Sequence, residues 1–331
     1  IDEAQRQAFL AEGRKPALRF ATDDLYGQVS WVDGVRDTIT FELSEIRDFN
    51  LMKSDGTPMY NWACVCDDRR MGITHVLRGE DGISNTPRQL LLYKALGWEP
   101  PLFSHLAFIL GEDGQKLSKR HGDTGIRSFI EKGYLPEALL NYLGLLGMGG
   151  DGEGAEIFSL DQMIERFSLD KLVKKASVFD YGKLDFLNAT WLRERSGSEL
   201  ATLAARFLED LPVPSPEWLS QACETFKGNA VLLRDLRAPI EALLKAPATP
   251  AGTPVAAFAK AAFNAWPVDD EGFKAAIKAA QKSSGLKGKD FFMPLRLALT
   301  GVEHGPELPK ILALLGQAEC FRRLDAATKG A

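Results

Sequence analysis

The pattern that most constrains the fold is a strand, a helix and a second strand, followed at once by a basic loop. GITHVLRGED (72–81) is apolar and β-branched, which predicts a buried strand. RQLLLYKALG (88–97) predicts a helix with Pro87 in its first turn and Gly97 at its end. HLAFIL (105–110) predicts the second strand. Strands joined through a helix are parallel, so we expect half of a parallel α/β sheet.

Short strands precede this segment. Residues 17–50 contain the β-branched and aromatic runs VSWV and TITFEL, which are broken by Gly27 and by Asp33-Gly34. These breaks are typical of turns between strands.

The second half of the chain is predicted to be helical. YLPEALLNYLGLLG (134–147) predicts a helix that begins near Pro136 and ends before Gly147. Apolar residues then recur at helical spacing in two stretches. They are Leu200, Leu203, Ala204, Phe207, Leu208 and Leu211 in one, and Val255, Phe258, Ala259, Ala262, Phe263 and Trp266 in the other. PATPAGTP (247–254) reads as a linker. The predicted fold class is α/β plus all-α.

Charge and cysteine content exclude some classes of protein. The net charge of -5 argues against an indiscriminate nucleic-acid binder, although local basic surfaces remain possible. The sequence contains no run of 18 apolar residues, so it predicts no membrane-spanning helix. Cys64 and Cys66 form a C-x-C without further ligands at zinc spacing, so we expect no metal site. The four cysteines lack paired spacing and fit a reducing cytoplasm.

The loop DGQKLSKRHGD (113–123) follows the second strand and carries the positive charges Lys116, Lys119 and Arg120 around Ser118. Ammonium groups at such a place can wrap a polyphosphate and neutralise the charge that develops on a leaving pyrophosphate. The alternative is a solvated surface loop, because short basic motifs are common.

Polar residues also end the first strand. Ligands of open α/β sheets lie at the carboxyl ends of strands, which is where Arg78 and Asp81 stand. Arg78 is suited to a carboxylate, and Asp81 to ribose hydroxyls or an amine. The alternative is a structural salt bridge with a capping carboxylate. The four histidines share no spacing, and no G-x-G-x-x-G or Walker loop occurs.

Taken in order, these segments resemble the bacterial glutamyl-tRNA synthetases, which are class I aminoacyl-tRNA synthetases. The resemblance runs through DGTPMYNWACVCDDRRMGITHVLRGEDGISNTPRQLLLYKALGW and HLAFIL to KLSKR, which is similar to the KMSKS motif. It continues through EIFSLDQMIERFSLDKLVKKASVFDYGKLDFLN to KGKDFFMPLRLALTGVEHGPELPKILALLGQAECFRRL, so it covers almost the whole chain.

The resemblance implies the C-terminal half of a class I Rossmann-type catalytic fold, followed by stem-contact and helical anticodon-binding domains. Residues 1–57 would end a connective insertion, and 58–112 would form the second half of the Rossmann-type domain. Residues 113–195 would hold the KMSKS loop and stem-contact region, and 196–331 the anticodon-binding region.

The activity implied by the resemblance is ATP-dependent ligation of L-glutamate to tRNA(Glu) through a glutamyl-adenylate, by a cytoplasmic monomer. Tyr60 and Arg78 would contact glutamate. The residues expected at ATP are Asp81, Ile109, Leu110 and Lys119, and those expected to act on the phosphates are Lys116, Ser118, Lys119 and Arg120. Mg²⁺ would accompany ATP, and any zinc of the family would lie upstream.

The sequence departs from the family at two places. Gly82 stands where the family usually has histidine, which we expect to change the local turn. No H-x-G-H occurs, so we expect an N-terminally truncated chain that cannot form the adenylate by itself. Glutamate-dependent ATP–pyrophosphate exchange by this chain would contradict that expectation.

Basic side chains in the helical half are candidates for tRNA contact. One cluster contains Lys171, Lys174 and Lys175, and a second contains Lys274, Lys278 and Lys282. Arg296 is a further candidate. Lysines would meet phosphates without reading sequence, while Phe291 and Phe292 beside Arg296 could stack on bases. The alternatives are solvated helix faces for the lysines and core positions for the phenylalanines.

Other functions are compatible with parts of this sequence. A ligase that also charges tRNA(Gln) is a close variant of this function, whereas glutaminyl-tRNA synthetases usually end in β-barrels and the short tRNA-modifying paralogue lacks a helical tail. A non-catalytic tRNA-binding or regulatory module would have no need for KLSKR and RGED. An unrelated α/β plus helical protein leaves the ordered matches unexplained.

Overall fold

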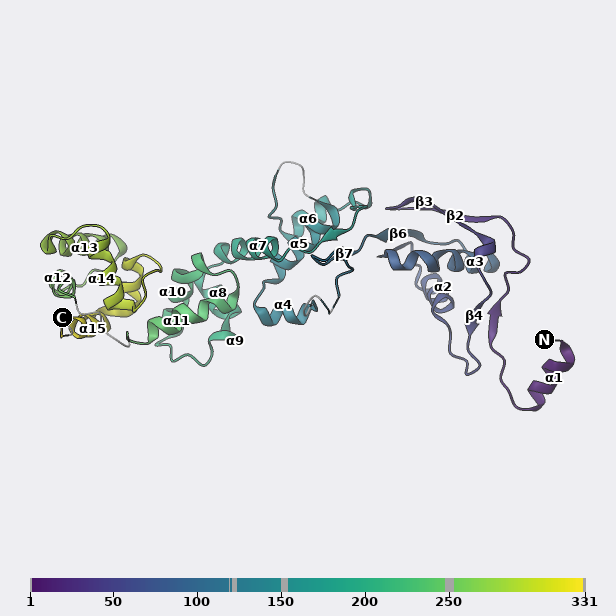
Figure 1. The fold of residues 1–331 in the computed structure, drawn as a ribbon, viewed down its shortest axis with the longest axis horizontal. Coiled ribbons are helices and arrows are strands. Elements are labelled where there is room, and N and C mark those ends of the chain that lie inside the picture. Colours follow the sequence, from purple (N-terminus) through teal and green to yellow (C-terminus); the bar gives the residue numbers. More distant parts are fainter. Residues whose placement is uncertain (1, 119, 121–123, 150–153, 248–252, 330–331) are drawn as a thin grey trace. The chain divides into compact units, whose positions relative to one another are not determined.

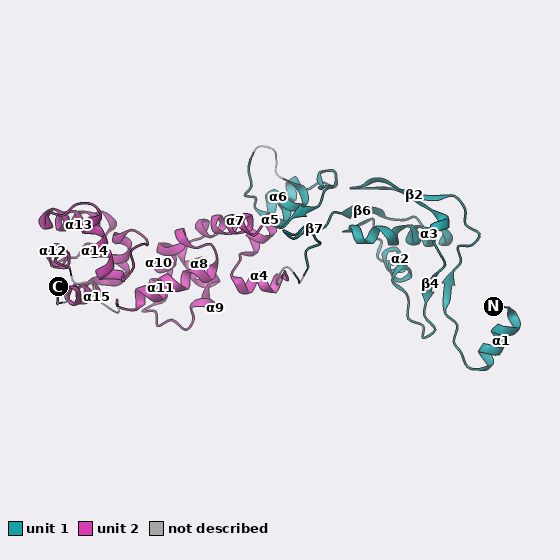
Figure 2. Ribbon diagram, viewed as in Figure 1, with its two compact units in different colours: residues 1–122, 143–179 teal, residues 123–142, 180–331 magenta. Residues whose placement is uncertain are grey.

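The computed structural model describes residues 2–118, 120, 124–149, 154–247 and 253–329. Figure 1 follows the elements along the chain. The chain forms two compact units, the first made of residues 1–122 and 143–179 and the second of 123–142 and 180–331 (Figure 2).

Unit 1 begins with helix α1 (Glu3–Ala11) and two antiparallel strand pairs. β1 (Leu18–Phe20) pairs with β4 (Phe49–Met52), and β2 (Gln28–Asp33) pairs with β3 (Asp37–Glu42). The turn between β2 and β3 lies at the predicted Asp33-Gly34 break, so the strand prediction for this region is confirmed.

The predicted half-sheet is present, but its first strand is not buried as predicted. No residue of that strand is buried and Leu77 is 42% exposed, because the sheet in the described residues has only two strands. β5 (His75–Gly79) and β6 (Leu102–Leu106) are parallel, and the short helix η2 (Glu80–Asn85) and helix α3 (Thr86–Leu96) connect them. α3 has its proline in the first turn and ends at Gly97, whose φ of 66° is the left-handed conformation that glycine adopts without strain. Helix α2 (Tyr60–Met71) precedes β5.

HLAFIL is not one strand as predicted. β6 ends at Leu106, and β7 (Ile109–Leu110) pairs instead with β8 (Ser177–Val178) in a separate parallel ladder. Between them, the backbone N–H of Phe108 donates to the carboxylate of Glu80 at 3.1 Å. A side chain therefore takes the hydrogen bond that would have continued the first ladder.

Helix α5 (Pro136–Met148) also extends beyond its predicted end. Gly147 lies inside the helix, and its carbonyl accepts a hydrogen bond from the N–H of Val173 at 2.8 Å. The left-handed residue is Gly149, with φ of 76°, whose N–H donates to the carbonyl of Leu145. The sequence offers two glycines close together, and the tertiary contact decides which one ends the helix.

In the described residues, unit 1 is completed by helix α6 and two short helices, and unit 2 is helical. The remaining elements of unit 1 are η1 (Leu43–Glu45), α6 (Leu160–Arg166) and η4 (Leu169–Lys171). Those of unit 2 are α4 (Ile126–Lys132), α7 (Tyr181–Glu194), α8 (Gly197–Leu203), α9 (Ala205–Leu208), α10 (Pro216–Phe226), η5 (Lys227–Asn229), η6 (Leu233–Leu236), α11 (Arg237–Leu244), α12 (Val255–Ala262), α13 (Asp270–Ser284), α14 (Lys289–Thr300) and α15 (Leu308–Lys329), with non-helical backbone at Gly316 in α15.

In the described residues of unit 2, apolar side chains form two large clusters. One surrounds Leu200, Ala204 and Leu208, and the other surrounds Phe263 and Phe291. The predicted helical spacing is confirmed for these buried positions, although α8 and α9 are separated at Ala204. Most of the predicted linker 247–254 lies outside the described residues.

Candidate active site

The two residues predicted to contact glutamate lie within reach of one another in unit 1. Arg78 is the penultimate residue of β5, and Tyr60 is the first residue of α2. Burial and a hydrogen bond with Cys64 raise the pKa of Tyr60, and the positive charge of Arg78 opposes the rise. The Tyr60 side chain is nevertheless 56% exposed, so a small molecule can reach it.

The Arg78 guanidinium is held by neutral groups. Nη2 donates to the carbonyl of Gly82 at 3.1 Å, to Thr86 Oγ1 at 2.7 Å and to Gln89 Oε1 at 3.0 Å. Nε donates to His105 Nε2 at 3.1 Å. None of these hydrogen bonds within the described part of the chain involves a carboxylate. No ion pair of Arg78 with a carboxylate is found among the described residues, which disagrees with the salt-bridge alternative at this residue. The positive charge of Arg78 nevertheless acts on the Asp68 carboxyl and opposes the rise that burial causes in its pKa.

Asp81 and Lys116 are brought together from the strand end and the basic loop. Their Oδ2 and Nζ atoms are 2.9 Å apart, and Lys116 Nζ lies 4.0 Å from the ring centroid of Phe108. The hydrogen bond from Lys116 lowers the pKa of Asp81. Both side chains are more than half exposed, so this pair contributes little stability and can separate around a ligand.

The first part of the basic loop is a closed turn. Gly111 N–H donates to the carbonyl of Gln115 at 2.8 Å, and Gly114 has φ of 73°. Ser118 Oγ accepts from the N–H of Arg120 at 3.4 Å. Lys119, the residue with the strongest prediction for phosphate contact, lies outside the described residues.

Ile109 and Leu110, the residues expected at adenine, form β7. The carbonyl of Ile109 accepts from the N–H of Leu117 and that of Leu110 from Phe179, each at 2.8 Å. Ile109, but not Leu110, lines a cavity of about 220 Å³ that also has Phe108 and Lys175 in its wall. The structure therefore brings one tRNA candidate to the same cavity as an ATP candidate.

A network that the sequence analysis missed supports these residues. Asp33 accepts hydrogen bonds from the backbone N–H groups of Val35, Arg36 and His105, and from His105 Nδ1 at 2.5 Å. Arg36 forms an ion pair with Glu80, which holds the backbone of Phe108. The signal available in the sequence was His105, which lies inside an apolar predicted strand. A buried histidine needs a hydrogen-bond partner, so it indicates a polar group packed against that strand.

No metal-binding group of three or more His, Cys, Asp or Glu is found among the described residues. Cys64 and Cys66 are half-buried on α2, and burial raises the pKa of Cys223 and Cys320 to about 12. Nor does any helix in the described ranges have the length and apolar character needed to cross a membrane.

The three tRNA candidates of unit 1 are exposed. Lys171 Nζ donates to the carbonyl of Arg166 at 3.3 Å, and Lys174 Nζ lies 2.8 Å from Asp37. Lys175 lines the cavity beside Ile109. The carboxylate of Asp37 partly offsets the charge of this cluster.

Helix α13 of unit 2 presents Lys274, Lys278 and Lys282 to solvent. Lys274 and Lys278 line a groove of about 530 Å³ together with Phe292 and Arg296. Lys274 also pairs with Glu271 at 2.8 Å. The structure thus brings four of the candidate residues for tRNA contact to one groove.

The two phenylalanines have different surroundings. Phe291 is 0% exposed and belongs to the core, whereas Phe292 is 41% exposed and borders the groove. The core interpretation therefore holds for Phe291 alone.

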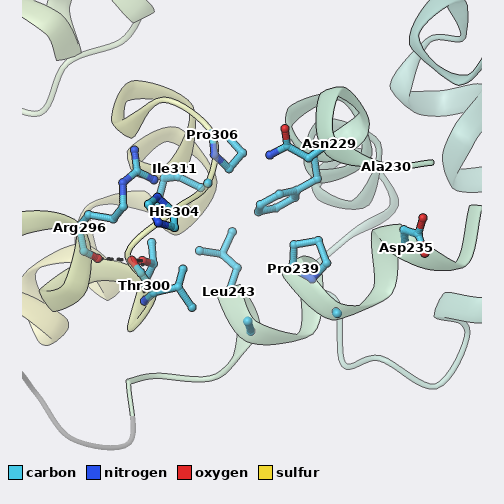
Figure 3. A pocket seen from close by; sticks show the side chains of 15 residues that line it. Asn229, Ala230, Asp235, Pro239, Leu243, Arg296, Thr300, His304, Pro306 and Ile311 are labelled. Atoms are coloured by element: carbon cyan, nitrogen blue, oxygen red, sulfur yellow. Dashed lines mark hydrogen bonds between the residues drawn. The ribbon is translucent and has the colours of Figure 1, made fainter. Parts of the chain in front are cut away.

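Arg296 lines that groove and also a second, largely apolar cavity of about 460 Å³, which Figure 3 shows. His304, Thr300 and Asn229 also line this cavity. Arg296 Nη1 is buried without a hydrogen-bond partner among the described residues, and burial lowers the pKa of the side chain. A buried donor of this kind is suited to an acceptor on a ligand.

Comparison with known proteins gives two family matches. Residues 1–186 match the family described as tRNA synthetases class I (E and Q), catalytic domain, and residues 199–328 match the anticodon binding domain family. The chain is 40% identical to the glutamate–tRNA ligase of Desulforamulus reducens, over 97% of this chain and 70% of that protein. It is 38% identical to the Bacillus subtilis glutamate–tRNA ligase, over 98% of this chain and 71% of that protein.

Solved structures agree as well. The glutamate–tRNA synthetase of Elizabethkingia anophelis has a TM-score of 0.87 and 29% identity, covering 99% of this chain and 71% of that one. A glutamate tRNA ligase from Elizabethkingia meningosepticum, solved in complex with its amino acid, has a TM-score of 0.88 over the same shares. With a family match over more than half its length and relatives of this identity and coverage, the chain belongs to the class I tRNA synthetases (E and Q), among the glutamate–tRNA ligases.

Proposed function

We propose that this chain supplies the Arg78, Asp81 and KLSKR part of an enzyme that ligates L-glutamate to tRNA(Glu) with ATP, through a glutamyl-adenylate, and that the chain does not form the adenylate by itself. The observation that carries this proposal is the Arg78 charge, which is held by neutral groups beside Tyr60 at the carboxyl end of β5. A guanidinium in that position takes a carboxylate in preference to a carboxamide. Arg78 accordingly binds the side-chain carboxylate of glutamate, and the Tyr60 hydroxyl contacts the same ligand.

ATP occupies the region between the strand end and the basic loop in this proposal. Asp81 contacts the nucleoside side, and Ile109 and Leu110 border the adenine. The α-carboxylate of glutamate attacks the α-phosphate, and the bond to pyrophosphate breaks. Lys116, Ser118, Lys119 and Arg120 neutralise the charge on the departing pyrophosphate, and Mg²⁺ accompanies the nucleotide. A terminal ribose hydroxyl of the tRNA then displaces AMP.

The tRNA lies along the basic positions. The proposed stem contacts are Lys171, Lys174 and Lys175, and the proposed anticodon contacts are Lys274, Lys278, Lys282 and Arg296. The groove shared by Lys274, Lys278 and Arg296 supports the second set. The division into 1–57, 58–112, 113–195 and 196–331, and a monomer acting in the cytoplasm, belong to the same proposal.

Binding to a panel of transcripts tests the proposal. At fixed salt we expect tighter binding of glutamate tRNA than of glutamine, aspartate or an unrelated tRNA, since phosphate contacts alone do not distinguish them. Changes at the anticodon bases should remove the preference. Equal affinity for glutamate and glutamine tRNA would favour a ligase that charges both, and equal affinity for the whole panel would contradict the proposal.

A further inference from the structure

The contacts of Arg78 fix the protonation state of a buried histidine. A guanidinium carries only N–H donors, so His105 Nε2, 3.1 Å from Arg78 Nε, must accept a hydrogen bond. The proton of the neutral ring is then on Nδ1, which donates to Asp33 Oδ2 at 2.5 Å. The Thr86 hydroxyl, 3.2 Å from Nε2, is compatible with the same tautomer.

The Asp33–His105 pair is fully buried. Both side chains are 0% exposed. Burial raises the cost of ionising Asp33, yet hydrogen bonds from the backbone and ring of His105 and from Val35 and Arg36 hold the pKa of this carboxyl below its usual value. An ionised Asp33 keeps the Nδ1 proton in place, and Nε2 therefore stays an acceptor for Arg78.

Gly82 completes this arrangement from the opposite side. A Cβ built on Gly82 would lie 2.4 Å from Arg78 Nε and 2.7 Å from its Cδ. No side chain fits there while Arg78 keeps its position. Because the obstructing atoms belong to a flexible side chain rather than to backbone, alanine at this position would displace Arg78 and leave the surrounding fold intact.

We propose that Asp33, His105 and Gly82 are positioning residues that hold the Arg78 guanidinium in the orientation required by the glutamate side chain. With Nε bound to His105 and Nη2 bound to Gly82, Thr86 and Gln89, the Nη1 edge is presented to the ligand carboxylate. The arrangement sets the preference for glutamate over glutamine, because a carboxylate offers the guanidinium two acceptor oxygens and a negative charge. A carboxamide offers one oxygen, and its NH2 group would face the N–H donors of Arg78. This inference rests on the proposed role of Arg78.

Nitrogen NMR of the histidine rings tests the tautomer without any ligand. We expect His105 to show a protonated Nδ1 and a bare Nε2 at neutral pH. In Asp33→Asn, the fixed Nδ1 tautomer should be lost while the exposed His75 keeps its spectrum. An imidazolium at position 105, or a ring protonated at Nε2 alone, would overturn the inference.

Calorimetric titration of the full chain with glutamate and with glutamine tests the consequence. We expect Gly82→Ala and His105→Leu each to weaken glutamate binding about tenfold, the value of one charge-assisted hydrogen bond, with little change for glutamine. His105→Gln keeps an acceptor for Arg78 and should stay within about threefold of wild type. Matched controls are Gly228→Ala, where an added Cβ meets nothing within 4 Å, and His75→Gln.

The variants separate two kinds of failure. If wild type does not bind glutamate, or Arg78→Met binds as wild type does, the proposed function is wrong. If Arg78→Met loses binding but Gly82→Ala and His105→Leu retain both affinity and preference, only the positioning inference is wrong. Melting temperatures identify any variant that fails to fold, and in that case Gly82→Ala and the histidine spectrum decide.

Discussion

At the scale of single residues, Arg323 shows how the helical unit holds a buried cation. Its side chain is 1% exposed. Nη1 donates to the carbonyl of Leu299 at 2.6 Å, Nη2 to that of Leu243 at 2.7 Å, and Nε to Glu319 at 2.7 Å. Hydrogen bonds from Arg322 and Arg323 hold the pKa of Glu319 down, to about 2.

Glu319→Gln is expected to destabilise the protein and to change its response to acid. Removing the counter-charge leaves Arg323 buried and uncompensated, which costs about 3 kcal/mol of unfolding free energy at pH 7. Because the folded pKa of Glu319 is depressed, its stabilisation is present above the ordinary glutamate pKa of 4.5 and is lost as pH falls towards about 2. Urea unfolding at several pH values should show a flatter acid dependence for the variant. The exposed Glu303→Gln is the control, and equal losses from both would contradict the assignment.

The candidate site was predictable from sequence where one residue carries its own signal. Arg78 and Lys116 stand out as charges at a strand end and in a glycine-flanked loop. Asp33 and His105 do not stand out as a pair in the sequence, because their hydrogen bond forms only when the turn that contains Asp33 packs against a strand distant in sequence. Local patterns describe turns and strands, whereas a buried pair is defined only by tertiary contact.

At the scale of elements, Asn188 on α7 joins segments that are separate in sequence. Its side chain is 0% exposed. Oδ1 accepts from the N–H of Leu135, at the start of α5, at 2.8 Å, and Nδ2 donates to the carbonyl of Val231 at 2.5 Å. One amide therefore satisfies a buried N–H and a partly buried carbonyl that lie outside the hydrogen bonding of any one helix or strand.

Asn188→Leu tests this role. The change preserves size but leaves one N–H and one C=O without partners, so we expect a decrease of about 3 kcal/mol in the free energy of unfolding. Guanidinium unfolding followed by circular dichroism measures it. Arg193→Gln on the exposed face of the same helix should cost less than about 0.5 kcal/mol. A decrease of that small size for Asn188→Leu would show that water replaces the amide.

Element types were predicted more reliably than element boundaries. The order of strand, helix and strand followed from apolar runs with Pro87 and Gly97 as boundary signals. The end of the strand in HLAFIL and the end of α5 could not be predicted in this way. Glu80 accepts the hydrogen bond of Phe108 after β6, and the N–H of Val173 donates to Gly147 in α5. Boundaries depend on such partners, and periodicity contains no information about them.

At the scale of the whole molecule, the net charge of -5 opposes binding of a polyanion. Any tRNA contact must then use local positive surfaces. Lys278 and Lys282 on α13 are exposed, and no ion pair is found for either among the described residues. These two lysines are therefore the best positions at which to test whether α13 binds tRNA phosphates.

Replacing both Lys278 and Lys282 by alanine should weaken binding of every transcript in the panel to the same extent. For each phosphate group that the variant no longer neutralises, the slope of log affinity against log salt should become shallower by about 0.7 to 0.9. Affinities measured from low to moderate salt provide the slope. Lys245→Ala, which removes a lysine paired with Glu241, is the control. An unchanged slope in the double variant would favour the solvated-face interpretation.

The missing side chain at position 82 also constrains how this sequence can evolve. A Cβ at Gly82 is incompatible with the present conformation of Arg78, and that conformation depends on the acceptor nitrogen of His105. Substitutions at these three positions are therefore not independent. The histidine that the family usually has at this position would need a different local turn or a different conformation of Arg78, so a side chain gained at 82 in this chain depends on one of those changes.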